Sequence, residues 1–109
     1  MSNRLFIELA AGIAITQFLK RSSIEIFGRN QWTLRPAGFP SSCGSWDRDM
    51  GMPSGHSVMA GIMFAHYQSP LWLLVPMWRV YDRCHTAPQV ILGFLLGILI
   101  KRCYSGNAS

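Results

Sequence analysis

The stretch Gly51-Met52-Pro53-Ser54-Gly55-His56-Ser57 is a polar turn that runs directly into the apolar segment Val58–Phe64. A proline, a hydroxyl residue, a glycine and a histidine therefore stand where a helix is expected to begin. The free N–H groups and the positive dipole end of a helix start attract anions, Gly55 lets a ligand approach the backbone, and Ser54 adds a hydroxyl donor. The pattern predicts an anion-binding corner suited to phosphate, with His56 inside it.

Composition points to a membrane. The chain of 109 residues has room for one domain, spanning 1–109, and half of it is hydrophobic while 14% is charged. The net charge of +5 suits anionic lipid or a phosphate-bearing substrate. The chain has no basic run and no interleaved aromatic platform, so nucleic acid is not an expected partner.

The cysteines indicate neither a disulfide framework nor a metal site. There are three, Cys43, Cys84 and Cys103, an odd number without the CxxC spacing of a zinc knuckle. We expect Cys43 and Cys84 to be free buried thiols, and a pair between them is the alternative. No cluster of metal-ligating residues stands out, so neither a metal nor another cofactor is expected.

Apolar segments predict an all-α fold of about four helices. The first helix is Leu5–Leu19, extended through Ile24–Phe27 and stopped by Gly28, and the second is Pro53–Tyr67. The third is Leu71–Val80, with a kink expected at Pro76. The fourth is Val90–Ile100, with Thr86 as its cap and Pro88 in its first turn. Gly93 and Gly97 share one helix face and favour close packing. Each apolar run is shorter than the roughly 18 residues that identify a spanning helix, so a multi-pass membrane bundle follows only from their sum. A soluble bundle is the alternative.

In the membrane topology, three polar segments fall on the same side. They are the long loop Gly28–Met52 with Arg35, the helix start at His56, and the segment Arg79–His85. Arginine forks match phosphate oxygens bidentately and stay charged, and two histidines could supply a nucleophile and a proton donor. The sequence predicts a site for phosphoryl transfer at this side. His66 has no motif around it and receives no role.

These segments resemble a known family. Arg35-Pro36, then Pro53-Ser54-Gly55-His56, then Arg79 followed after five residues by His85 are similar to the three ordered motifs of the type 2 phosphatidic acid phosphatase superfamily, which also contains vanadium haloperoxidases. The resemblance covers about Gly28 to Gly97. It implies a membrane helical bundle that hydrolyses lipid phosphates without a metal.

The resemblance also implies a role for each matching residue. His85 is the expected nucleophile that forms a phosphohistidine, and His56 the general acid for the leaving group. Arg35 and Arg79 are expected to hold phosphate oxygens. Ser54 and Gly55 are expected to add hydroxyl and backbone donors.

Three positions depart from the family pattern. The family lysine falls on Gly28, with Arg29 beside it as the candidate substitute, and the serine before the third-motif arginine is Trp78. The acid four residues beyond the nucleophile is Gln89, an amide that can accept a hydrogen bond from the imidazole but cannot stabilise an imidazolium by charge. Asp82 is an alternative source of that charge.

Gln89 also points to a subfamily. Together with Arg79-Val80-Tyr81 and Gly51-Met52, it resembles the dolichyl diphosphate phosphatase branch, which implies a polyprenyl diphosphate substrate. The family has six helices where this chain has room for about four, so a minimal core or a homo-oligomer is expected. A catalytically silent lipid-phosphate binder and a phosphatidic acid phosphatase are the alternative functions, whereas a haloperoxidase is disfavoured because the known ones are soluble and much larger.

Overall fold

The fold is entirely helical over the part of the chain that the structure, a computed structural model, describes, which is residues 3–36 and 51–105. Its elements are α1 (Asn3–Phe27), α2 (Gly55–Tyr67), the short 3-10 helix η2 (Pro70–Leu73), α3 (Leu74–Tyr81) and α4 (Ala87–Ser105). The all-α class and the four α-helices agree with the sequence-based expectation. Cys43 lies outside the described residues.

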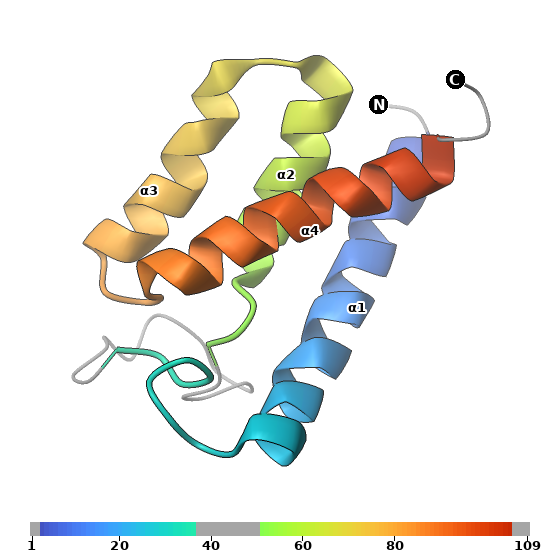
Figure 1. The fold of residues 1–109 in the computed structure, drawn as a ribbon. Coiled ribbons are helices and arrows are strands. Elements are labelled where there is room, and N and C mark those ends of the chain that lie inside the picture. The colour runs from blue at the N-terminus through green and yellow to red at the C-terminus, as the bar shows by residue number, and fades with distance from the viewer. Residues whose placement is uncertain (1–2, 37–50, 106–109) are drawn as a thin grey trace.

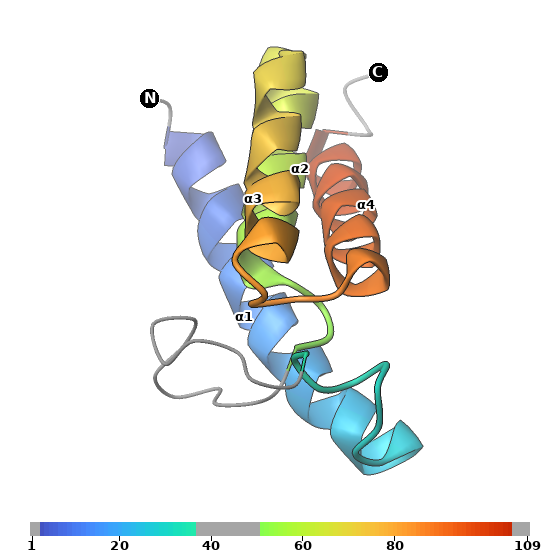
Figure 2. The same cartoon turned by 90° about the vertical axis from the view of Figure 1, so that its left-hand side faces the viewer.

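The helices place the motif segments at one end of the molecule. Helices α2 and α3 form an antiparallel pair, α4 crosses α2, and α1 lies along the other side of this group (Figures 1 and 2). The start of α2, the connection from α3 to α4 and the segment that follows α1 lie towards one end. The start of α1 and the end of α4 lie at the opposite end.

The ends of α1 and α2 follow from local chemistry. Helix α1 stops where predicted, because Gly28 takes a φ of 77° and its N–H bonds to the Ile24 carbonyl at 2.8 Å. Helix α2 begins at Gly55, two residues later than Pro53, because Ser54 is its N-cap and accepts a hydrogen bond from the Ser57 N–H at 3.3 Å.

The predicted kink at Pro76 is absent, and the segment instead changes from a 3-10 helix to an α-helix before this residue. The 3-10 turn Pro70–Leu73 is capped by Ser69, whose hydroxyl accepts from the Leu71 N–H at 3.3 Å, and α3 follows directly. Pro76 is the third residue of α3. An N–H in this first turn has no partner within the α-helix, so the missing proton of proline leaves α3 uninterrupted.

Glycines bring α2 and α4 into backbone contact. A Cβ atom on Gly97 would overlap the Val58 carbonyl, and one on Gly61 would overlap the Phe94 carbonyl. A Cβ on Gly93 would lie 2.7 Å from the Ser54 carbonyl oxygen. The close packing expected of Gly93 and Gly97 is confirmed, and it fixes the start of α4 against the cap of α2.

Helix α1 has a polar interior face. Glu8, Thr16 and Lys20 are 0%, 1% and 3% exposed, and their spacing places them on one side of the helix. Phe18 and Ile26, in contrast, are 69% and 72% exposed. A helix at a water-covered surface carries the opposite arrangement, with its apolar stripe inside.

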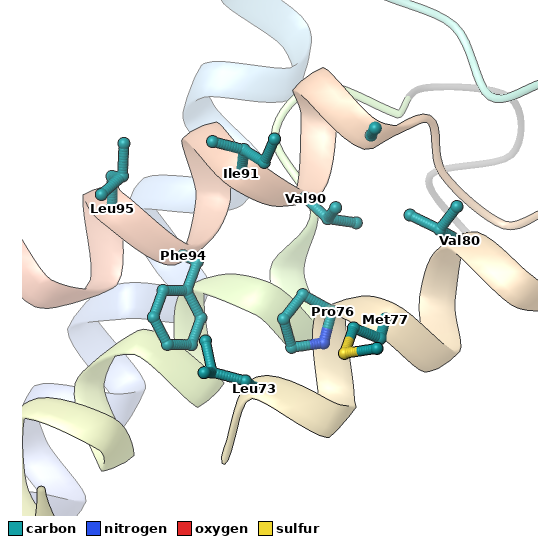
Figure 3. A pocket seen from close by; sticks show the side chains of 9 residues that line it. Leu73, Pro76, Met77, Val80, Val90, Ile91, Phe94 and Leu95 are labelled. Atoms are coloured by element: carbon teal, nitrogen blue, oxygen red, sulfur yellow. The ribbon is translucent and has the colours of Figure 1, made fainter. Parts of the chain in front are cut away.

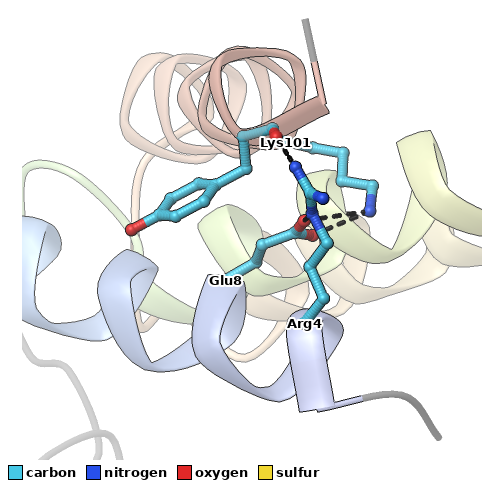
Figure 4. Close-up of polar contacts among 4 residues, drawn as sticks. Arg4, Glu8 and Lys101 are labelled. Atoms are coloured by element: carbon cyan, nitrogen blue, oxygen red, sulfur yellow. Dashed lines mark hydrogen bonds and ion pairs between the residues drawn. The ribbon is translucent and has the colours of Figure 1, made fainter. Parts of the chain in front are cut away.

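An ion-pair cluster joins α1 to α4 at the end remote from the motifs. The Glu8 carboxylate lies 2.8 Å from Lys101 Nζ and 3.5 Å from Arg4 Nε, as Figure 4 shows. The Arg4 guanidinium also donates to the carbonyl of Tyr104. A buried carboxylate needs such partners, so this cluster holds the start of α1 against the last turn of α4.

One helix among the described residues has the length and composition of a membrane span. It is α4, over Ala87–Tyr104. Helix α2 has 13 residues and α3 has 8, fewer than the roughly 20 that cross a bilayer. Core helices of soluble proteins can resemble α4, so the observed architecture is an all-α fold of four helices with one apolar helix of spanning length.

Candidate functional site

His85, in the connection from α3 to α4, is the centre of the site. It is 2% exposed, and its Nδ1 lies 2.9 Å from the Gly51 carbonyl oxygen. A carbonyl only accepts hydrogen bonds, so Nδ1 carries the proton and Nε2 of the neutral ring carries a lone pair. Nε2 lies 3.2 Å from Arg35 Nη1, which donates to it. The ring is therefore fixed as the tautomer whose Nε2 can act as a nucleophile.

Arg35 joins the long loop to the segment that carries His85. It is 6% exposed, and its Nη1 also donates to the Cys84 carbonyl at 3.0 Å. The Gly51 N–H donates to the Thr33 carbonyl at 2.9 Å, which joins the two ends of the long loop beside Arg35. The side chain of Arg35 thus links this loop to the segment that carries His85.

Positive charge surrounds His85. Burial, followed by the charges of Arg35, Lys20 and Arg79, lowers its pKa from 6.5 to about 3, against the Gly51 hydrogen bond, which raises it. Arg79 is 5% exposed and lies in the last turn of α3. Three separate segments therefore direct cations at one neutral histidine, an arrangement that suits an anion of several charges.

Lys20 is the site residue that the motifs do not reveal. On its face of α1, the Ser23 hydroxyl donates to the Met52 carbonyl at 3.3 Å, and a Cβ on Gly55 would lie 3.5 Å from Thr16 Cγ2. Lys20 lies between these contacts, beside the turn that precedes α2. The signal in the sequence is its place in the polar stripe with Glu8 and Thr16 on an apolar helix.

The candidate substitute Arg29 lies elsewhere. It is exposed, directly after α1, and among the described residues it is not one of the charges that act on His85. Asp82, the alternative acid, also does not act on the His85 pKa and lies at the C-cap of α3. Lys20 is the cation of α1 that acts on His85, a residue that the sequence interpretation did not name as part of the site.

Gln89 has partners other than the imidazole. Its Oε1 accepts from the Thr86 N–H at 3.0 Å, and its Nε2 donates to the carbonyls of Trp32 and Leu34 at 3.2 and 2.5 Å. The first contact is half of a capping box, in which the third helical residue reaches back to the cap residue. The expected hydrogen bond from His85 to Gln89 is therefore replaced by one to Gly51.

Gln89 nevertheless shapes the site through Gly51. A Cβ on Gly51 would lie 2.7 Å from Gln89 Oε1 and 2.9 Å from the Arg35 backbone nitrogen. Only glycine fits between them, and its carbonyl then reaches Nδ1 of His85. The amide acts as a support for the acceptor of His85 because it holds the loop and α4 together.

Ser54, Gly55 and His56 form the predicted helix start. The Ser54 N–H donates to the Gln89 carbonyl at 3.3 Å, and its hydroxyl caps α2. His56 is exposed and packs edge-on against Trp78, with 6.1 Å between ring centroids. The Arg79 guanidinium lies 5.1 Å from the centre of the same indole, so Trp78 connects His56 to Arg79.

The remaining cysteines and histidine clarify the surroundings. Cys84 is disulfide-bonded, contrary to the free thiol expected, whereas Cys103 is free and exposed. A bridge at the residue before His85 ties down the backbone that presents the imidazole. His66 is exposed at the far end of α2 and packs against Tyr67.

The depressed pKa of His85 predicts a pH-dependent stability. The unfolded chain gains a proton on this side chain near pH 6.5, whereas the folded chain resists it until about pH 3. The free energy of unfolding should therefore fall as pH decreases from 6.5 towards 3, by at most about 1.4 kcal/mol per pH unit from this group. Unfolding in detergent, followed by circular dichroism at several pH values, measures this slope.

The control separates His85 from the other titrating groups. The variant His85→Asn should lose this component of the slope, and His66→Asn, at the exposed far end of α2, should keep it. Equal slopes in the wild type and in His85→Asn would contradict the buried neutral imidazole.

Comparisons with known proteins identify no family. No protein-family model, no curated protein and no solved structure matches the chain. The described residues also contain no group of three His, Cys, Asp or Glu side chains that could hold a metal. The arrangement of His85 with Arg35, Lys20 and Arg79 is therefore the feature from which a function is inferred.

Proposed function

We propose that this chain is a multi-pass membrane phosphatase that hydrolyses a lipid phosphate or diphosphate, with a polyprenyl diphosphate as the favoured substrate. The observation that carries the proposal is the neutral, buried imidazole of His85, whose Nε2 faces Arg35 at 3.2 Å among three cationic side chains. A nucleophile that stays unprotonated beside several cations suits attack on a phosphoryl group.

In the first step the substrate phosphate binds the Arg35 guanidinium and replaces its hydrogen bond to His85, which leaves the Nε2 lone pair free. The Nε2 lone pair forms a bond to phosphorus as the bond from phosphorus to the leaving oxygen breaks. Lys20, Arg35 and Arg79 stabilise the charge on the phosphoryl oxygens. The imidazole becomes cationic, and the Gly51 carbonyl, 2.9 Å from Nδ1, stabilises it as a dipole where the family uses an acid.

His56 completes the reaction at the site entrance. It donates a proton to the leaving oxygen of the lipid, so that an alcohol or a lipid monophosphate departs. It then accepts a proton from water, which attacks phosphorus and breaks the bond to Nε2. The products are inorganic phosphate and the neutral His85 ring, and the exposure of His56 beside Trp78 suits contact with both lipid and water.

Three observations support a membrane location. Helix α4 has the length and hydropathy of a span, and large apolar side chains such as Phe6 and Phe18 are 65% and 69% exposed. The inward polar face of α1 is the arrangement expected when the outer face contacts lipid. A site at the end of the bundle would then meet a headgroup while the tail remains in the bilayer.

The test is a phosphate-release assay on the detergent-solubilised protein in the presence of a chelator. Polyprenyl diphosphate, polyprenyl monophosphate and phosphatidic acid are compared, and we expect release without a divalent metal, fastest from the diphosphate. Fastest release from phosphatidic acid would identify the alternative phosphatase.

Two results would overturn the proposal. Saturable binding of the lipid phosphates without any release would show a silent lipid-phosphate binder. A strict requirement for a divalent metal would contradict attack by a histidine on a phosphate held by lysine and arginine side chains.

A further inference from the structure

An apolar groove lies between α3 and α4. Its volume is about 540 Å³, within the range of ligand pockets, and only apolar residues line it. Figure 3 shows Met77 and Pro76 of α3 facing Phe94 and Ile91 of α4 across this space. Met77 and Ile91 are 64% and 56% exposed, so the groove is open along its side.

Two residues that line the groove are close in sequence to the proposed phosphate site. Its lining includes Val80, which follows Arg79 directly, and Ala87, two residues beyond His85. Arg79 and His85 are themselves buried in the site. The connection from α3 to α4 thus brings residues of the cationic site close in sequence to residues that line the groove. This arrangement suits a lipid whose anionic headgroup binds at the site and whose apolar tail enters the groove.

We infer that this groove holds the headgroup-proximal part of the single aliphatic tail of the lipid phosphate, an inference that rests on the proposed function. From Ala87 to Leu95 the groove follows α4 over nine residues, and the eight steps between them, at about 1.5 Å each, give a length of roughly 12 Å. Such a groove accommodates one chain along the helices, and the rest of the tail extends into the bilayer.

A second hollow lies on another side of α4 and offers a matched control. It is smaller, about 250 Å³, and it is lined by Leu92 and Leu96 with residues of α1, among them the hydroxyl residues Ser22 and Ser23. Leu92 is 50% exposed, close to the 56% of its neighbour Ile91. The variants Ile91→Trp and Leu92→Trp therefore add the same bulk at adjacent, similarly exposed positions, and each fills a different hollow.

The kinetic test compares a long polyprenyl diphosphate with a prenyl diphosphate of one isoprene unit. Ile91→Trp should raise KM for the long substrate about tenfold, as expected when roughly two methylene groups lose their burial, and leave kcat for both substrates unchanged. Leu92→Trp should behave as the wild type. An equal effect of Ile91→Trp on both substrates, or a length-dependent effect of Leu92→Trp instead, would overturn the inference.

A second measurement is independent of turnover. A polyprenyl phosphate with a diazirine near its headgroup is cross-linked to the solubilised protein, and the labelled peptides are identified by mass spectrometry. Labels on Met77 or Leu95 that Ile91→Trp abolishes would support the groove, and labels confined to α1 or to Leu92 would overturn it. A change in oligomeric mass caused by Ile91→Trp, without a change in labelling, would assign the groove to a second copy of the chain.

The two measurements separate the groove from the function on which it rests. If the wild type releases phosphate from neither substrate, the proposed function is wrong, and the position of the cross-link alone decides whether the groove binds a tail.

Discussion

Replacing His85 by asparagine is expected to lower phosphate release by at least about a thousandfold, because the nucleophile is lost. Asparagine can keep a donor close to the position of Nδ1, so the hydrogen bond to the Gly51 carbonyl and the backbone around Cys84 should persist. The asparagine has no counterpart of Nε2, the atom that faces Arg35 at 3.2 Å. Initial rates of phosphate release from polyprenyl diphosphate measure the loss.

His66→Asn is the matched control for that variant. His66 is exposed at the far end of α2, so the same substitution there should leave the rate within about twofold of the wild type. Thermal midpoints of both variants in detergent show whether the fold is retained. A His85→Asn variant that is folded and still releases phosphate at the wild-type rate would disprove the nucleophile assignment and the phosphohistidine.

Replacing Lys20 by methionine is expected to reduce kcat/KM for the lipid diphosphate roughly 10- to 100-fold. Loss of one charge-assisted contact to phosphate accounts for a change of that size. Methionine is an unbranched, helix-compatible side chain and can fill the buried space, since Lys20 is 3% exposed. Removing this positive charge should also raise the pKa of His85 towards its ordinary value, which an NMR titration of the imidazole can follow.

Arg21→Met is the control for Lys20→Met, because Arg21 is the next residue of α1 and is exposed. It removes one positive charge without reaching His85, so both kcat/KM and the His85 pKa should remain at the wild-type values. If the two variants lose activity equally, the effect comes from general surface charge. Lys20 would then have no specific part in phosphate binding.

Local sequence patterns were sufficient for the helices and their ends. Gly28 stops α1, as its left-handed backbone requires, and α2 ends at Tyr67 as expected. The glycines Gly93 and Gly97 correctly indicated a close helix crossing. One error was the start of α2, which lies at Gly55 because a serine cap competes with proline for the first position. The other was the kink at Pro76, where the structure has a 3-10 turn followed by an uninterrupted α3.

Partners across the fold were less predictable. Gln89 was assigned to His85 by its spacing, yet its amide joins Thr86 to the carbonyls of Trp32 and Leu34. Nothing in the spacing distinguishes these outcomes, because backbone carbonyls from a distant loop are as good acceptors as a side chain. A cap residue with glutamine three positions later was the available signal for a capping box.

The sequence by itself determined the helical class, the approximate helix ends and the presence of Arg35, Arg79 and His85 as residues suited to phosphate chemistry. These depend on composition, periodicity and local backbone preferences. Only the tertiary structure decided that Lys20 joins them, that the Gly51 carbonyl orients the imidazole and that Cys84 is oxidised. The physical reason is that burial and the packing of α1 and α4 against α2 set the distances between residues far apart in the chain, and those distances fix the protonation state and the partner of each side chain.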